Sequence, residues 1–158
     1  RVDLLVEAMR FVRARIGLKI AGEGEEALRL RALAGGDGRI EFLGQVSREA
    51  VLEHYSEALA VPFVPVGEDF GFVTAEAFAS GKPVITCRDS GEPARLVQDG
   101  RTGFVCPPRP EEIADRIDRL AADPSGAVAM GHRARESADL PTWEEVGRRL
   151  LAELARAR

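Results

Sequence analysis

The sequence predicts an α/β fold in which a doubly wound, Rossmann-like parallel sheet carries helices on both faces. Two observations lead to this prediction. Up to Pro107, short apolar runs rich in β-forming residues alternate with helical patterns, and this alternation is typical of βαβ crossovers. The chain has 158 residues, 45% of them hydrophobic, which is enough to bury the core of one domain.

The alternation begins with a helix and a strand. Leu5, Ala8, Met9 and Val12 recur at helical spacing, and the apolar run 18–21 after Gly17 predicts a buried strand. The later elements are predicted from the same two signals, helical spacing of apolar residues and short apolar runs. In order, they are a helix over 25–33, a strand over 39–43, a helix from Ser47, a strand opening at 59–61, a helix over 73–80, a strand over 83–87, a helix over 92–97 and a strand over 103–105.

After Pro107 the strand pattern stops, and residues 109–158 predict a helical coat that ends in a C-terminal helix. Pro110 suits the first turn of a helix, which ends at 123–124. Thr142 and Glu145 have the spacing of a capping box for the last helix. The sequence contains no repeat or linker, so residues 1–158 are expected to form one domain.

Composition and charge exclude several classes of protein. The net charge of −4 comes from 26 acidic and 22 basic residues scattered in both signs, so no basic stripe indicates nucleic acid as a partner. No apolar run approaches the roughly 20 residues of a membrane span. Cys87 and Cys106 lie in apolar, strand-like surroundings, which favours buried free thiols and a cytoplasmic location. A start at Arg1, without methionine and within a helical pattern, indicates a piece of a longer polypeptide.

Three glycine-containing loops follow predicted strands, at 22–24, 67–71 and 89–91. Ligands of open parallel sheets bind at the carboxyl ends of the strands, where such loops meet. Together, the three loops favour an anion or sugar pocket whose walls are backbone. Each loop alone also fits a glycine that only turns the chain.

The loop 67–71 is the most informative of the three. Gly71 allows the backbone to approach a ligand, and the helix after it is expected to offer unpaired N–H groups at Val73, Thr74 and Ala75, which suit a phosphate. Glu68 and Glu76 stand eight positions apart, and carboxylates accept paired hydrogen bonds from vicinal hydroxyls. The alternative is a solvated loop charge and a favourable helix charge.

The stretch 68–85, EDFGFVTAEAFASGKPVI, resembles the E-x7-E signature of glycosyltransferase family 4, whose members are retaining GT-B enzymes. The likeness extends over nearly the whole chain, to RVDLLVEA at 1–8, IAGEG at 20–24, IEFLG at 40–44 and DGRTGF at 99–104. It implies the C-terminal half of a GT-B architecture, with the acceptor bound by an N-terminal domain absent from this chain.

The resemblance also implies roles for single residues. Glu68 would contact hydroxyls of the transferred hexose, Glu76 would hold the ribose, and the helix start at Val73 and Thr74 would carry the diphosphate. The remaining donor-binding positions that it implies are Phe70, Gly71 and Phe72 beside Glu68, Gly22 in the first glycine loop, and Gln45 and Val46 at the edge of the base.

The same resemblance implies a UDP- or GDP-linked sugar as substrate, with no cofactor and no metal. His54 and His132 lie on predicted helices and are expected at the surface. The N-terminal GT-B domain would be the partner, and a peripheral membrane contact of the full-length protein stays open. The cations that stabilise the leaving group would lie upstream of Arg1, so the isolated domain is expected to be inactive.

Two residues depart from the family pattern. Glu92 and Arg95 follow the 89–91 loop where the family places a second glycine and, three positions later, an acid. This departure keeps open a nucleotide-sugar-binding module without turnover. A third hypothesis, a dinucleotide-dependent oxidoreductase, depends on the 22–24 loop alone and lacks both the third glycine and the ribose-binding acid at their required spacing.

Overall fold

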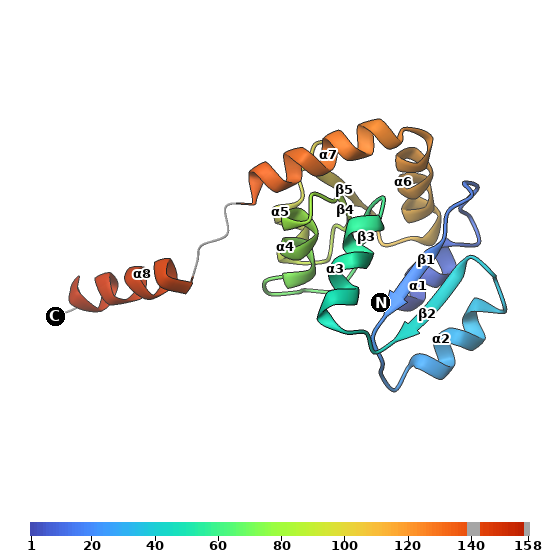
Figure 1. Ribbon diagram of the computed structural model, residues 1–158, viewed down its shortest axis with the longest axis horizontal. Coiled ribbons are helices and arrows are strands. Elements are labelled where there is room, and N and C mark those ends of the chain that lie inside the picture. Colours follow the sequence, from blue (N-terminus) through green and yellow to red (C-terminus); the bar gives the residue numbers. More distant parts are fainter. Residues whose placement is uncertain (139–142, 157–158) are drawn as a thin grey trace.

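The computed structural model describes residues 1–138 and 143–156, and of Trp143 it describes the backbone alone. Each expected element is present, and most ends differ from the prediction by one or two residues. The exception is the first helix, which ends at Ala8, so that Val12 lies beyond it, although Val12 is buried in the core as expected of its apolar position. In chain order the elements are α1 (Val2–Ala8), β1 (Leu18–Ala21), α2 (Ala27–Ala34), β2 (Ile40–Gly44), α3 (Arg48–Glu57), β3 (Val61–Pro62), α4 (Phe72–Ala79), β4 (Val84–Cys87), α5 (Glu92–Leu96), β5 (Gly103–Cys106), α6 (Pro110–Ala122), α7 (Pro124–Ser137) and α8 (Trp143–Arg156) (Figure 1).

All strand pairs are parallel, as expected, but the strands form two hydrogen-bonded sheets. β1 pairs with β2, whereas β3, β4 and β5 form a second sheet in that order. Gly103 of β5 pairs with Val84 of β4, and a Cβ atom at Gly103 would lie 2.0 Å from the Val84 carbonyl oxygen. Only glycine allows the two strands to approach this closely.

Helices cover both faces of β4, the central strand of the three-stranded sheet. All four residues of β4 are buried. Ile85 and Cys87 belong to a core cluster with residues of α1 and α6, whereas Val84 belongs to a second cluster with α4 and α7. The doubly wound arrangement is therefore confirmed. Cys87 and Cys106 are both buried and free, as their apolar surroundings predict.

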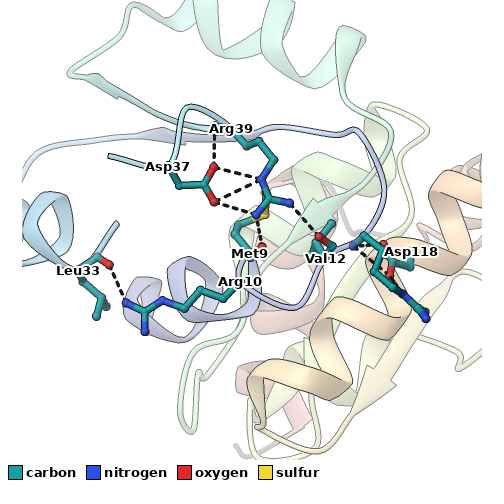
Figure 2. A network of polar contacts seen from close by, with 8 residues as sticks. Met9, Arg10, Val12, Leu33, Asp37, Arg39 and Asp118 are labelled. Atoms are coloured by element: carbon teal, nitrogen blue, oxygen red, sulfur yellow. Dashed lines mark hydrogen bonds and ion pairs between the residues drawn. The ribbon is translucent and has the colours of Figure 1, made fainter. Parts of the chain in front are cut away.

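A network of polar contacts fixes the chain between α1 and β1 (Figure 2). The Arg39 guanidinium donates to the carbonyl oxygens of Met9 and Val12, the latter at 2.8 Å, and forms an ion pair with Asp37 at 2.8 Å. That guanidinium lowers the pKa of Asp37 to about 2. Asp118 of α6 accepts the backbone N–H of Ala14 at 2.9 Å. These contacts anchor the β1–β2 pair to α1 and α6.

The last three helices differ in how they pack. α6 contacts α1, and α7 contacts α4, so these two helices form the expected coat. Figure 1 shows α8 standing apart from the body of the molecule, and its Leu150, Leu151 and Leu154 are exposed. The capping box predicted at Thr142 lies outside the described residues. Within the described part of the chain, no helix is long and apolar enough to cross a membrane.

Candidate functional site

The candidate site lies where β3 and β4 end, and two loops are joined there by their backbones. Gly67 N–H donates to the Asp89 carbonyl at 2.9 Å, and Glu68 N–H donates to the Ser90 carbonyl at 3.0 Å. The Glu68 carbonyl in turn accepts the Glu92 N–H at 2.9 Å. These bonds continue the parallel pairing beyond the strands, so the backbone position of Glu68 is set by the neighbouring loop.

Two glycines make this close approach feasible. A Cβ atom at Gly91 would lie 2.4 Å from the Glu68 carbonyl oxygen, and Gly91 has a φ of +77°. Gly71, at the start of α4, has a φ of +74°, and a Cβ atom there would lie 2.6 Å from Cγ of Pro93. A side chain at either position would meet both steric overlap and backbone strain. Gly71 N–H also approaches the Glu68 Oε1 atom at 3.3 Å.

The first turn of α4 corrects one sequence prediction. The amides of Thr74 and Ala75, predicted to be unpaired, donate to the Gly71 carbonyl at 2.8 and 3.3 Å. Because Gly71 is the N-cap residue, its carbonyl accepts the first intrahelical bonds. Within the described residues, the N–H groups of Phe72 and Val73 have no acceptor. The donors available to an anion at this helix start are therefore Phe72 and Val73.

Glu76 has a partner that the sequence analysis missed. It lies on α4, and its Oε2 atom accepts a hydrogen bond of 3.0 Å from the hydroxyl of Tyr55 on α3. Burial and the adjacent Glu76 carboxylate raise the pKa of Tyr55, so its hydroxyl stays protonated and donates. The sequence places Tyr55 on the apolar face of a helix, which gives no sign of a polar contact with Glu76.

Phe70 and Phe72 form an aromatic pair beside Glu68. Their ring centroids are 4.7 Å apart and the ring planes are inclined by 47°. The two side chains remain 41% and 65% exposed. The loop thus presents an apolar surface next to the Glu68 carboxylate and the free amides of Phe72 and Val73, an arrangement that suits the face of a sugar ring.

Arg1 joins the start of the chain to the same edge. Its guanidinium donates two hydrogen bonds of 2.8 Å to the carboxylate of Asp89, and it also binds the carbonyls of Val64 and Pro65 at 2.8 and 2.7 Å. The ion pair raises the pKa of Arg1 and lowers that of Asp89. Asp89 is another contact that the sequence analysis did not identify.

Glu92 and Arg95, which depart from the family pattern, pair with each other at 3.6 Å, and 83% of the Arg95 side chain is exposed. The Glu92 carboxylate therefore faces its own helix partner, although its backbone N–H is bound to Glu68. Among the described residues, no three histidine, cysteine or acidic side chains gather in a group that could hold a metal.

The other predicted donor-binding residues belong to the β1–β2 pair. Gly22 follows β1 with a φ of +119°, and its N–H donates to the Gly44 carbonyl at 2.7 Å. Gln45 and Val46 follow β2. In the described ranges, no hydrogen bond or ion pair joins these three residues to Glu68 or Glu76. The link from Gln45 and Val46 to Glu76 is α3, which follows them in the chain and contacts Glu76 through Tyr55.

Comparison with known proteins gives a consistent answer. The model of the family described as glycosyl transferases group 1 matches residues 1–123. A GDP-mannose-dependent alpha-(1-6)-phosphatidylinositol monomannoside mannosyltransferase of Mycolicibacterium smegmatis is 34% identical over 171 aligned positions, covering 99% of this chain and 44% of that protein.

Two solved structures share the fold. Sucrose-phosphate synthase from Thermosynechococcus elongatus has a TM-score of 0.80 at 30% identity, covering 99% of this chain and 43% of that one. Anabaena HepE, in complex with UDP and glucose, has a TM-score of 0.79 at 21% identity, covering 98% and 44%. The chain spans less than half the length of the curated relatives that it matches.

Proposed function

Because the chain belongs to the glycosyl transferases group 1 family, we propose that it is the donor-binding domain of a retaining, family 4 GT-B hexosyltransferase. The observation that supports this proposal most directly is the start of α4. There, the free amides of Phe72 and Val73 stand in the chain between two carboxylate residues, Glu68 in the preceding loop and Glu76 in the same helix. This set of groups can receive a diphosphate flanked by two hydroxyl-bearing sugars.

In this proposal each group has a distinct task. Glu68 accepts hydrogen bonds from the transferred hexose, and the Phe70–Phe72 pair contacts the apolar face of its ring. Glu76, oriented by Tyr55, accepts the ribose hydroxyls. The amides of Phe72 and Val73 stabilise the negative charge that develops on the leaving diphosphate. Gly71 keeps the loop close enough for all of these contacts.

The finer aspects of the donor and the whole protein are also proposals. We propose a UDP- or GDP-linked hexose as substrate, with no metal or cofactor. The M. smegmatis relative is GDP-mannose-dependent and HepE was solved with UDP, so both bases have a precedent among similar proteins. Gly22, Gln45 and Val46 would lie at the edge of the nucleotide base. The acceptor would bind a separate N-terminal domain, and the two free cysteines support a cytoplasmic location.

Calorimetric titration of the 158-residue chain with UDP, GDP and ADP tests donor binding. We expect weak binding of UDP or GDP that Glu76→Gln weakens further, while Glu111→Gln, an exposed position at the start of α6, leaves it unchanged. A chain that is folded by circular dichroism but releases no heat with any nucleotide at millimolar concentration would contradict the proposal.

A transfer assay on the full-length protein separates the two remaining functions. Release of UDP or GDP that depends on an acceptor, with retention of the anomeric configuration in the product, is expected for the transferase. Nucleotide-sugar binding without turnover would instead indicate a binding module. The Glu92–Arg95 pair beside Glu68 is the observation that favours this second function, and Glu92→Gly is the variant expected to restore turnover in that case.

A further inference from the structure

The loop after β1 brings a carboxylate to the proposed base edge. The loops after β1 and β2 leave the same end of this parallel strand pair (Figure 1), and the Gly22 N–H joins them by donating to the Gly44 carbonyl at 2.7 Å. A Cβ atom at Gly44 would lie 3.4 Å from the Glu23 Oε1 atom. The Glu23 carboxylate therefore lies against the Gly44 backbone, directly before Gln45 and Val46, which are proposed to contact the base.

This carboxylate is available to accept hydrogen bonds from a ligand. Glu23 is exposed, and within the described ranges no hydrogen bond or ion pair engages its side chain. Glu26, at the end of the same loop, is instead paired with Arg29 of α2. An ionised carboxylate has two acceptor oxygens and no donor, so it can accept two parallel hydrogen bonds from one partner. Glu23 thus offers a paired acceptor at the end of β2.

Two backbone donors accompany the carboxylate. In the part of the chain that the structure describes, the N–H groups of Gln45 and Val46 have no acceptor, whereas the carbonyl of the preceding Gly44 is occupied by Gly22. The parallel pairing of β1 and β2 ends at this bond, so the next two amides are left for other partners. The base edge therefore combines free N–H donors with one carboxylate acceptor.

Guanine is the base whose hydrogen-bonding edge matches this combination. Its Watson–Crick edge presents one acceptor, O6, beside two donors, N1–H and the N2 amino group. The two donors can bind both oxygens of one carboxylate while O6 accepts a backbone N–H. Uracil presents a single donor, N3–H, between two carbonyl oxygens, so a carboxylate that faces N3–H also meets an oxygen lone pair. Adenine has the N1 lone pair where guanine has N1–H, and a carboxylate repels it.

We infer that Glu23 makes the proposed donor site selective for guanine, so that the donor is a GDP-linked sugar. This inference rests on the proposed function, from which it takes the place of the base, and it decides between the two bases proposed there. A uracil bound at the same place would leave the carboxylate without its paired donors, and sites built to hydrogen-bond a group discriminate against ligands that lack it.

NMR titration of the isotopically labelled chain with nucleotides tests the inference without a transfer assay. Shift changes at the Gln45 and Val46 amides report binding at the base edge and give the dissociation constant even where binding is weak. We expect GDP to bind at least about tenfold more tightly than UDP or ADP, as the loss of one charge-assisted hydrogen bond implies. Inosine diphosphate, which lacks the N2 amino group, should bind at least about threefold more weakly than GDP.

The variant Glu23→Gln separates base recognition from the other donor contacts. It should reduce the affinity for GDP to about that for UDP and leave the affinity for UDP within about twofold of the parent, because the ribose and diphosphate contacts stay in place. The difference between GDP and inosine diphosphate should also fall below about twofold. Glu25→Gln is the matched control, since it removes the same charge from an exposed position of the same loop, and it should preserve the preference for GDP.

Three results would overturn the inference. UDP could bind the parent chain as tightly as GDP does. Alternatively, Glu23→Gln and Glu25→Gln could change the affinity for GDP to the same extent, which would indicate a general effect of charge. Both of these results include nucleotide binding, so they would leave the proposed function intact. The third result, a folded chain whose amide shifts respond to no nucleotide, would contradict the proposed function and the guanine selectivity together.

Discussion

The loops after β3 and β4 differ from those after β1 and β2 in what holds them. The 67–71 and 89–91 loops are joined by successive backbone hydrogen bonds, and Gly71 and Gly91 have no room for a side chain. The 22–24 loop has one backbone bond to Gly44, and a Cβ atom at Gly22 or Gly24 would meet nothing within 4 Å. The chain thus fixes its proposed sugar and phosphate contacts through backbone packing and leaves the proposed base edge open.

Glycine substitutions in the two kinds of loop should show this difference with the largest effect on stability. Gly91→Ala places a methyl group against the Glu68 backbone at a positive φ, so we expect a loss of about 2–4 kcal/mol in the free energy of unfolding. Gly24→Ala is the matched control in the open loop and should change it by less than about 0.5 kcal/mol. Urea denaturation of both variants measures the difference, and equal losses would mean that the two loops are equally constrained.

Replacing each carboxylate by a carboxamide tests whether Glu68 and Glu76 have different roles in the proposed donor site. In the full-length enzyme, Glu76→Gln should raise KM for the donor with a smaller effect on kcat, because a ribose contact is made in ground and transition states alike. Glu68→Gln should mainly lower kcat. A lost charge-assisted hydrogen bond is worth about 1.5–3 kcal/mol, or roughly tenfold to a hundredfold in either constant. Steady-state kinetics that match the parent in both variants would remove these residues from the site.

Loss of the hydrogen bond from Tyr55 of α3 to Glu76 of α4 is expected to have a smaller effect. Tyr55→Phe removes the 3.0 Å hydrogen bond to Glu76 and keeps the ring in place. We expect KM for the donor to rise by roughly twofold to tenfold, corresponding to about 0.5–1.5 kcal/mol, with kcat little changed. Ser56→Ala, at an exposed neighbour whose hydroxyl binds only its own helix, should leave both constants as they are. A change in kcat alone would argue against a positioning role.

At low pH, the β1–β2 pair should lose stability before the loops after β3 and β4, because those loops are joined by hydrogen bonds between uncharged backbone groups. The Arg39 guanidinium lowers the pKa of Asp37 to about 2 from its usual 3.8. Because the folded-state pKa is lowered, the stabilisation is present above the unfolded pKa, near 4, and is lost as pH falls through about 2. Asp37→Asn should therefore lower Tm at pH 7 and make little difference near pH 2. Thermal unfolding across this range checks both the sign and the window.

Sequence reasoning was most successful where the signal is local. The alternation of apolar runs and helical patterns located β1 to β5 and the helices between them to within one or two residues, and Ser47 caps α3 by accepting the Ala50 N–H, as a helix start there requires. It was wrong on the amides of Thr74 and Ala75, because it did not anticipate that the Gly71 carbonyl would bind both. The roles of Glu68 and Glu76 stay predictions until the kinetics are measured.

The amino-acid sequence by itself determined the α/β class, the order of elements and the glycines that allow two loops to meet, since each depends on neighbours along the chain. Tertiary structure alone decided that Tyr55 would bind Glu76, that Arg1 would bind Asp89, and that the strands would form two separate hydrogen-bonded sheets. These contacts join residues tens of positions apart. Periodicity and propensity describe a residue's own helix or strand, whereas such contacts depend on how separate elements pack.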